Sequence, residues 1–454
     1  MELTKLSLTE AASLLQRRQI SSEELTGACL ERIAGHDSEI NAFITVTAGQ
    51  ALDQARQADR AAAQGTWLGR LHGVPIALKD LFETGGVRTT AGSRVLAGYV
   101  PSEDCTVYQK LRDAGAVLLG KTNMHEWAFG VTSQNPHYGA VRNPWDPSRI
   151  AGGSSGGSAA ALAAGFCFGA LGTDTGGSIR IPAALCGVVG LKPTYGKIST
   201  AGVIPLSASL DHVGPMGKTA EDVALLYAVV SNGWDRESQR FSESEPAWLA
   251  DALILDCASD PYFGEVDVPV GEAVREAASV FESLGAEVRE TPFPGAEEAL
   301  AANVTILLAE AAAYHRETVR SRPQDYSPDV LERLRRGAEI GPDELAQARA
   351  ARRRLREQFI RSFDQFDILL TPTTPSAAIP IQVSDPLQAA PTYTRFTAPF
   401  NLAGLPALSV PCGLTPGGLP VGLQLVGPPG AERLLLAAAR AFDFASGWRT
   451  SRSP

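Results

Sequence analysis

The chain has 454 residues, and its content of 44% hydrophobic and 20% charged residues is typical of a globular protein. Its formal net charge of −10 argues against a nucleic-acid-binding protein, because such proteins usually carry a basic surface. No stretch reaches the roughly 20 apolar residues that cross a bilayer, and the N-terminus has no signal-peptide pattern, so we predict a cytoplasmic protein without a membrane partner.

Helices and short buried strands alternate in the first quarter of the chain. Ser21 and Glu24 match a capping box, and apolar residues follow them at helical spacing. The run that ends at Lys79 is short, apolar and closed by a charge, which is typical of a buried strand. The predicted elements are helices within 7–35 and over 48–64 and 104–114, and strands over 73–80 and 116–121.

A stretch rich in Gly, Pro, Asn and Ser occupies residues 130–157, and we predict that it is irregular. Loops of this length are uncommon in compact domains unless they are functional. The stretch leads into a helix over 158–165, a strand over 166–172 and a polar glycine turn over 173–180.

The rest of the chain continues the alternation. The predicted elements are a polar connecting loop over 231–250, a strand–helix–strand unit over 252–255, 270–284 and 286–288, a mostly helical region over 296–363, and strands over 368–370, 407–410 and 421–426. Strands therefore come from both ends of the chain. This pattern predicts an α/β layered architecture and favours one large domain.

Two glycine–serine motifs stand out, at 152–158 and 172–180. The first has no lysine for a phosphate loop and does not fit a dinucleotide fingerprint. It does match Gly-x-Ser-x-Gly, the nucleophile elbow, with His212 and His315 as possible bases, but residues 143–149 before it resemble a turn rather than a strand. A flexible linker is unexpected between apolar strands.

A further interpretation uses both motifs together with a lysine base. A serine hydroxyl is a weak nucleophile until a base takes its proton, and none of the six histidines lies in a Gly/Ser cluster. A neutral lysine can replace histidine. Neutrality at pH 7 needs a pKa about 3 units below the usual ~10.4, a shift that burial can supply. Lys79 closes an apolar strand, where such burial is expected.

Taken together, these motifs resemble the amidase signature family. The resemblance rests on the run that ends at Lys79, on both glycine–serine motifs, and on residues 187–194, 209–215 and 401–406. It implies an amidase signature fold, a large mixed and twisted β-sheet with helices on both faces. It also implies one domain over 1–454, with a signature core at about 65–230 and a more variable helical substrate-side region at about 296–365.

The resemblance also implies a role for each site residue. Ser178 would be the nucleophile that forms the acyl-enzyme, Lys79 the base, and Ser154, after a cis peptide bond, the proton relay between them. The backbone N–H groups of Thr175, Gly176, Gly177 and Ser178 would form the oxyanion hole. We expect Ser155, Asp174 and Arg180 to support the site structurally. The reaction needs no cofactor, and the six scattered cysteines indicate neither a metal site nor disulfides.

Within the family, the sequence favours a stand-alone amidase that acts on a small-molecule amide, with a homodimer as a possible assembly. One alternative is the glutaminase component of a tRNA-dependent amidotransferase, in which case the remaining amidotransferase subunits would be partners. Residues 233–238 and 326–363 do not have the features expected of that branch. A ureide hydrolase of the biuret or allophanate type is a third candidate. A relative without activity is a fourth, although all three catalytic positions are filled.

Overall fold

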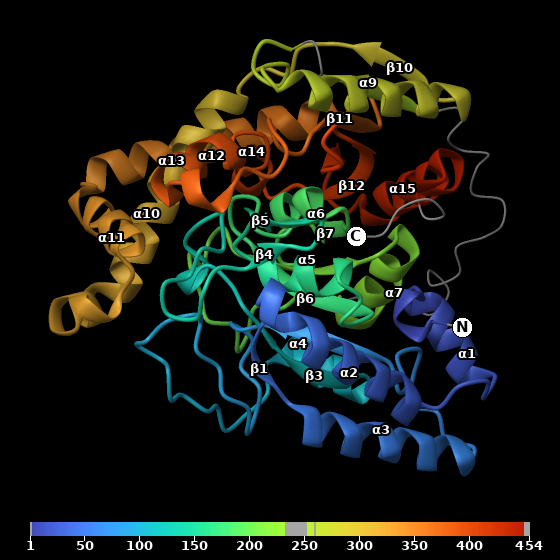
Figure 1. Ribbon diagram of the computed structural model, residues 1–454. Helices are drawn as coiled ribbons and strands as arrows, with labels where there is room; N and C mark the ends of the chain where they lie inside the picture. Colours follow the sequence, from blue (N-terminus) through green and yellow to red (C-terminus); the bar gives the residue numbers. More distant parts are fainter. Residues whose placement is uncertain (1, 232–251, 258–259, 449–454) are drawn as a thin grey trace.

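One mixed sheet of eleven strands runs through the molecule (Figure 1). It belongs to a computed structural model that describes residues 2–231, 252–257 and 260–448. The strands are β1 (Phe43–Val46), β2 (Pro75–Lys79), β3 (Val117–Thr122), β6 (Gly169–Asp174), β7 (Val189–Lys192), β8 (His212–Gly217), β9 (Leu253–Asp256), β10 (Glu287–Glu290), β11 (Ile368–Pro372), β12 (Ala407–Leu414) and β13 (Pro420–Val426).

The strand order places the site residues side by side. The order is β1-β3-β2-β6-β8-β7-β12-β13-β11-β9-β10. Strand β2 lies between β3 and β6 and is parallel to both, with Leu78 opposite Leu171 of β6. Because the carboxyl ends of parallel strands meet at one edge, Lys79 at the end of β2 comes out beside the end of β6.

Helices flank this sheet. They are α1 (Leu8–Gln16), α2 (Ser22–Ile40), α3 (Ala48–Ala63), α4 (Thr106–Asp113), α5 (Gly156–Ala163), α6 (Arg180–Cys186), α7 (Ala220–Val230), α9 (Val268–Ser283), α10 (Ala296–Ser321), α11 (Pro328–Glu339), α12 (Pro342–Ser362), α13 (Pro386–Thr394), α14 (Ala398–Leu402) and α15 (Glu432–Ser446). Helices α5 and α6 pack on each other and on the central strands, and α7, α9 and α15 form a second group against the same sheet. The predicted α/β class with a mixed, helix-flanked sheet is confirmed.

Most predicted elements are found within a few residues of their expected limits. The capping box is confirmed: the Ser21 hydroxyl accepts the N–H of Glu24 at 3.1 Å, and the Glu24 carboxylate accepts the N–H of Ser21 at 2.8 Å. Strand β6 begins and ends later than the predicted 166–172. The predicted loop at 231–250 lies almost wholly outside the described residues.

The prediction that 130–157 is irregular was wrong in part. A two-stranded hairpin of β4 (Arg142–Asn143) and β5 (Asp146–Ile150) lies there, so the turn expected over 143–149 contains a strand. The strand is held by a distant segment: Ile150 N–H donates to the Ile379 carbonyl at 3.0 Å, and the Arg149 guanidinium donates to the Ala378 carbonyl at 2.7 Å. A local sequence pattern cannot reveal a partner more than 200 residues away.

Helices α11 and α12 both pack on α10, and Figure 1 shows α10 and α11 in yellow and orange at one side of the molecule. A buried apolar cluster that includes Ile306, Leu355 and Phe400 joins α10, α12 and α14. Within the described part of the chain, none of the helices has the length and apolar character needed to cross a membrane.

Candidate active site

Lys79 lies at the end of β2 with its side chain fully buried. Its Nζ donates to the Ser154 hydroxyl at 2.7 Å and to the Thr173 hydroxyl at 2.8 Å. Burial lowers the pKa of Lys79 to about 7, although the carboxylates of Asp211 and Asp174 act in the opposite direction. A large fraction of the amine is therefore neutral near pH 7, and its lone pair is available to a hydroxyl proton.

Ser154 lies in the turn before α5, and the peptide bond between Gly153 and Ser154 is cis, as expected. Its carbonyl oxygen accepts the backbone N–H of His125 at 3.2 Å and the hydroxyl of Ser133 at 3.4 Å. An added Cβ at Gly153 would lie 2.6 Å from the Ser133 Oγ, so a larger residue would displace that contact. The segment 125–133 therefore holds the backbone of Ser154 in place.

Ser178 follows β6 and is the most exposed of the three expected catalytic residues, at 6%, whereas Lys79 and Ser154 are at 0%. Its carbonyl accepts the N–H of Ser155 at 3.1 Å, which ties the two motifs together. Within the described residues no hydrogen bond joins the hydroxyls of Ser154 and Ser178. The structure therefore connects Lys79 to Ser154 directly and connects Ser178 to the neighbouring Ser155 through the backbone, and the Ser178 hydroxyl has no hydrogen-bond partner in the part of the chain that the structure describes.

The Ser155 hydroxyl is hydrogen-bonded to the backbone of β6. Its hydroxyl donates to the Thr173 carbonyl at 3.2 Å and accepts the Thr173 N–H at 3.3 Å. These bonds hold the first motif against the strand that carries the second.

The backbone N–H groups of the turn between Asp174 and Ser178 differ in whether they already have a hydrogen-bond acceptor. The Asp174 carboxylate accepts the N–H of Gly177 at 2.8 Å, so this group, expected in the oxyanion hole, is already engaged in holding the turn. The N–H groups of Thr175, Gly176 and Ser178 have no acceptor among the described residues. Gly177 has a φ of 136°, and an added Cβ would lie 2.2 Å from the Thr397 Oγ1, so both conformation and space require glycine.

Asp174 and Arg180 form a fully buried ion pair under this turn, at 2.9 Å. Burial alone would raise the pKa of the Asp174 carboxyl, but the Arg180 guanidinium outweighs it and holds that pKa well below its usual range. Arg180 also donates to the Gln424 side chain at 2.6 Å and to the Thr397 carbonyl at 3.0 Å. The pair therefore joins the turn to β13 and to the segment before α14.

Replacing Arg180 with methionine is expected to lower the free energy of unfolding by about 3–5 kcal/mol, because Asp174 would remain buried and unpaired. Urea denaturation followed by far-UV circular dichroism measures this loss. Arg289→Met is the matched control, since the Arg289–Glu287 pair is more than half exposed and its loss is expected to cost less than about 1 kcal/mol. Equal effects of the two substitutions would contradict the buried pair's role.

The histidines considered as bases do not contact Ser154. His212 Nδ1 is bound to the Leu210 carbonyl at 2.7 Å, and His315 Nδ1 to the Tyr326 hydroxyl at 3.1 Å. Burial lowers the pKa of His212 well below its usual value and that of His315 to about 4. The geometry therefore offers no histidine base for a nucleophile elbow at Ser154. In the described chain, no group of three or more His, Cys, Asp or Glu side chains is placed to hold a metal ion.

Three residues near the site were not predicted. Thr173 binds the Lys79 amine, and the Thr175 hydroxyl donates to Asp211 at 2.6 Å. Asn303 of α10 donates to the Thr175 carbonyl at 3.3 Å. Thr173 and Asp211 lie within motifs of the sequence, so their position was a usable signal, whereas Asn303 lies in a helix without any motif.

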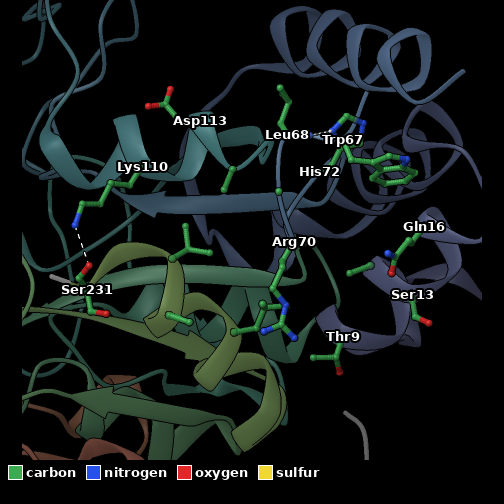
Figure 2. Close-up of a pocket in the computed structure, with 16 residues that line it drawn as sticks. Thr9, Ser13, Gln16, Trp67, Leu68, Arg70, His72, Lys110, Asp113 and Ser231 are labelled. Atoms are coloured by element: carbon green, nitrogen blue, oxygen red, sulfur yellow. Dashed lines mark hydrogen bonds between the residues drawn. The ribbon is translucent and has the colours of Figure 1, made fainter. Parts of the chain in front are cut away.

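Two hollows differ in their relation to this site. A cavity of about 240 Å³ adjoins it, lined by Thr173, Asp211 and His212 among mostly apolar side chains. A larger surface groove of about 860 Å³, lined by residues such as Trp67 and Lys110, contains none of the site residues (Figure 2). The candidate site therefore borders the smaller cavity and not the larger groove.

The chain is similar over nearly its whole length to several known proteins. A family model described as "Amidase" matches residues 24–436. The chain is 40% identical to the A subunit of glutamyl-tRNA(Gln) amidotransferase from Geobacter sp. (strain M21), over 100% of both chains. It is 34% identical to an amidase of known structure, with a TM-score of 0.89 and coverage of 97% and 100% of the two chains. It is 30% identical to a peptide amidase of Stenotrophomonas maltophilia, with a TM-score of 0.83 and coverage of 99% and 98%.

Proposed function

The chain belongs to the amidase family, and we propose that it cleaves amide bonds through an acyl-enzyme on Ser178. Lys79 takes a proton from Ser154 while Ser154 takes one from Ser178, and the Ser178 Oγ attacks the carbonyl carbon. The same path returns a proton to the leaving nitrogen, so ammonia or an amine departs. Water then gives a proton to Lys79 as it attacks the ester, the bond between the carbonyl carbon and the Ser178 Oγ breaks, and the proton returns to Ser178 as the carboxylate leaves.

The observation that carries this proposal is the buried Lys79 amine, bonded to Ser154 at 2.7 Å and with a pKa of about 7. A charged lysine could only donate to Ser154, whereas the neutral amine can accept its proton. The Ser178 side chain has three staggered rotamers, and the relay uses the one that turns its hydroxyl toward Ser154.

We assign the oxyanion hole to the N–H groups of Thr175, Gly176 and Ser178, which are the three without an acceptor among the residues that the structure describes. The Asp174 carboxylate holds the turn through Gly177, so these donors are fixed before the negative charge develops. Asn303 also helps to fix the turn, because its side-chain amide donates to the Thr175 carbonyl at 3.3 Å.

The substrate we propose is a small neutral amide. The three atoms nearest to an added Cβ at Gly176 belong to the uncharged residues Asn303, Thr394 and Ala398, at 3.7, 3.7 and 3.9 Å. Among the described residues that line the adjoining cavity, Asp211 supplies a carboxyl group and there is no lysine or arginine. Free glutamine carries a carboxylate whose binding in a buried site needs a charge partner. These surroundings therefore favour a stand-alone amidase over a glutaminase.

With a panel of neutral primary amides, anilides, biuret and glutamine, we expect kcat/KM to be at least about tenfold higher for the best neutral amide than for glutamine, a difference of about 1.4 kcal/mol. Coupled detection of ammonia, or of the aniline, measures it on the purified chain. Ser178→Ala controls for contaminating activity. Glutamine as the best substrate would contradict the assignment.

A second candidate function is that of the glutaminase component of an amidotransferase, which is favoured by 40% identity over 100% of the Geobacter protein. It makes a different prediction: glutaminase activity that is low alone and rises when partner subunits are added. Affinity purification of the tagged chain from its own cells, followed by mass spectrometry, distinguishes the two. Recovery of stoichiometric partner subunits would support this candidate, and recovery of the chain alone the first.

A further inference from the structure

Segment 125–133 supports Ser154, and its own backbone is unusual. Trp127, Ala128 and Ser133 all have positive φ, at 54°, 59° and 52°. Side chains on these residues make the left-handed region costly, and a bulky aromatic one especially so. Such a conformation persists only where the surroundings impose it, so the contacts of this segment determine where the Ser154 carbonyl is held.

Helix α11 makes several of the contacts that hold segment 125–133. The Asp329 carboxylate binds His125 Nε2 at 2.9 Å, and the Arg333 guanidinium donates to the Phe129 carbonyl at 2.7 Å. At the start of the helix, the Ser327 N–H donates to the Glu126 carboxylate at 2.7 Å. These hydrogen bonds therefore reach three residues of the segment, at positions 125, 126 and 129.

The two charged residues of α11 are also bound to each other and to a third element. Arg333 donates to Asp329 at 2.7 Å and to the Pro386 carbonyl at 2.6 Å, where α13 begins. The side chains of Arg333, Asp329 and His125 are 7%, 13% and 1% exposed, so water does not compete strongly for these bonds. Burial would raise the pKa of Asp329, but His125 and Arg333 hold it well below its usual range, so the carboxyl stays ionised.

The path from α11 to the reaction is short. The His125 ring contacts Asp329, and the His125 backbone N–H donates to the Ser154 carbonyl at 3.2 Å. Ser154 in turn binds the Lys79 amine at 2.7 Å. A shift of His125 would therefore move the relay hydroxyl relative to both Lys79 and Ser178, and proton transfer falls steeply with such displacement.

We propose that α11 is a positioning element for the reaction: Asp329 and Arg333 hold segment 125–133, and through His125 they hold Ser154 in the geometry that the proton relay requires. This inference rests on the proposed function, since it assigns residues that act through Ser154. Neither residue is a catalytic residue, because neither touches the reacting atoms.

The test compares Asp329→Asn and Arg333→Gln with the wild-type chain in kcat, KM, Tm and the rate at which a fluorophosphonate labels Ser178. Assays are run well below the Tm of each variant. We expect kcat and the labelling rate to fall together by at least tenfold, with KM changed less than threefold. This split separates positioning from substrate binding, which would change KM.

Two further variants separate positioning from loss of stability. Arg336→Gln changes an exposed arginine of the same helix and is expected to leave all four quantities unchanged. Phe281→Leu weakens a buried position of α9 and is expected to lower Tm without lowering kcat. If the α11 variants lowered Tm but kept wild-type kcat and labelling, the positioning role would be wrong. If the wild-type chain itself were not labelled at Ser178, the proposed function would be wrong.

Discussion

Ser178→Ala is expected to reduce kcat by roughly 10⁴- to 10⁶-fold, the range found when one member of the catalytic group of a serine hydrolase is removed. Without Oγ no acyl-enzyme forms, and only the oxyanion donors and substrate binding remain. Initial rates with the best amide of the panel measure the loss, and intact-protein mass spectrometry measures the covalent adduct with a fluorophosphonate. The adduct should be absent from the variant and stoichiometric in the wild-type chain.

Ser155→Ala is the matched control for this experiment, since Ser155 is a neighbouring buried serine whose hydroxyl is bound to the backbone of Thr173. Its loss removes two hydrogen bonds and is expected to lower the free energy of unfolding by about 1–3 kcal/mol, with kcat changed much less than in Ser178→Ala and with labelling retained. An active, labelled Ser178→Ala protein, or an unlabelled Ser155→Ala protein, would move the nucleophile away from Ser178.

Lys79→Met is expected to lower kcat about as much as Ser178→Ala does. In the wild-type enzyme, the pH dependence of kcat/KM should follow the titration of the Lys79 amine. Because burial lowers the pKa of Lys79 to about 7, kcat/KM should rise about tenfold per pH unit below 7 and level off above it. Stopped assays from pH 5 to 10 measure this profile. A rate that still rose steadily up to pH 10 would contradict the lowered pKa of Lys79, and a rate that fell above pH 7 would show that the amine works in its charged form.

The stability of the fold provides a second readout of the same amine. The unfolded chain keeps Lys79 protonated up to about pH 10.5, whereas the folded chain releases that proton near pH 7, so wild-type stability rises with pH between these values. The full difference corresponds to roughly 4–5 kcal/mol. Lys79→Met removes this pH dependence. The variant should therefore be inactive, and its free energy of unfolding should exceed that of the wild type by more at pH 7 than at pH 9.5. Urea denaturation of both proteins at pH 7 and 9.5 tests the sign.

The sequence alone was enough to indicate the family and the class of the fold, and it supplied the three residues that we propose for the reaction path. Lys79, Ser154 and Ser178 each lie in a short motif with a recognisable local pattern. An apolar run precedes the lysine, and glycines surround both serines. Strand and helix limits were close to those predicted for the same reason, because apolar periodicity and caps act between residues that are near in sequence.

The sequence analysis did not predict the sheet strands β1, β7 and β8, and β8 is the one whose own residues favour a strand least. Strand β8 reads His-Val-Gly-Pro-Met-Gly and pairs with β6 and β7 in the middle of the sheet. Its neighbours on both sides supply the hydrogen bonds that a weak strand former needs, so its conformation is decided by pairing rather than by its own propensity.

Only the tertiary structure decided which residues surround the motifs. The neighbours β2 and β6 bring Thr173 to the Lys79 amine, α10 brings Asn303 to the turn, and α11 brings Asp329 to His125 across 204 residues of chain. Such contacts depend on strand order and helix packing, which arise from many distant residues at once. The motifs therefore pointed to the family and to the chemistry that we propose, while packing decided which distant residues surround the proposed relay.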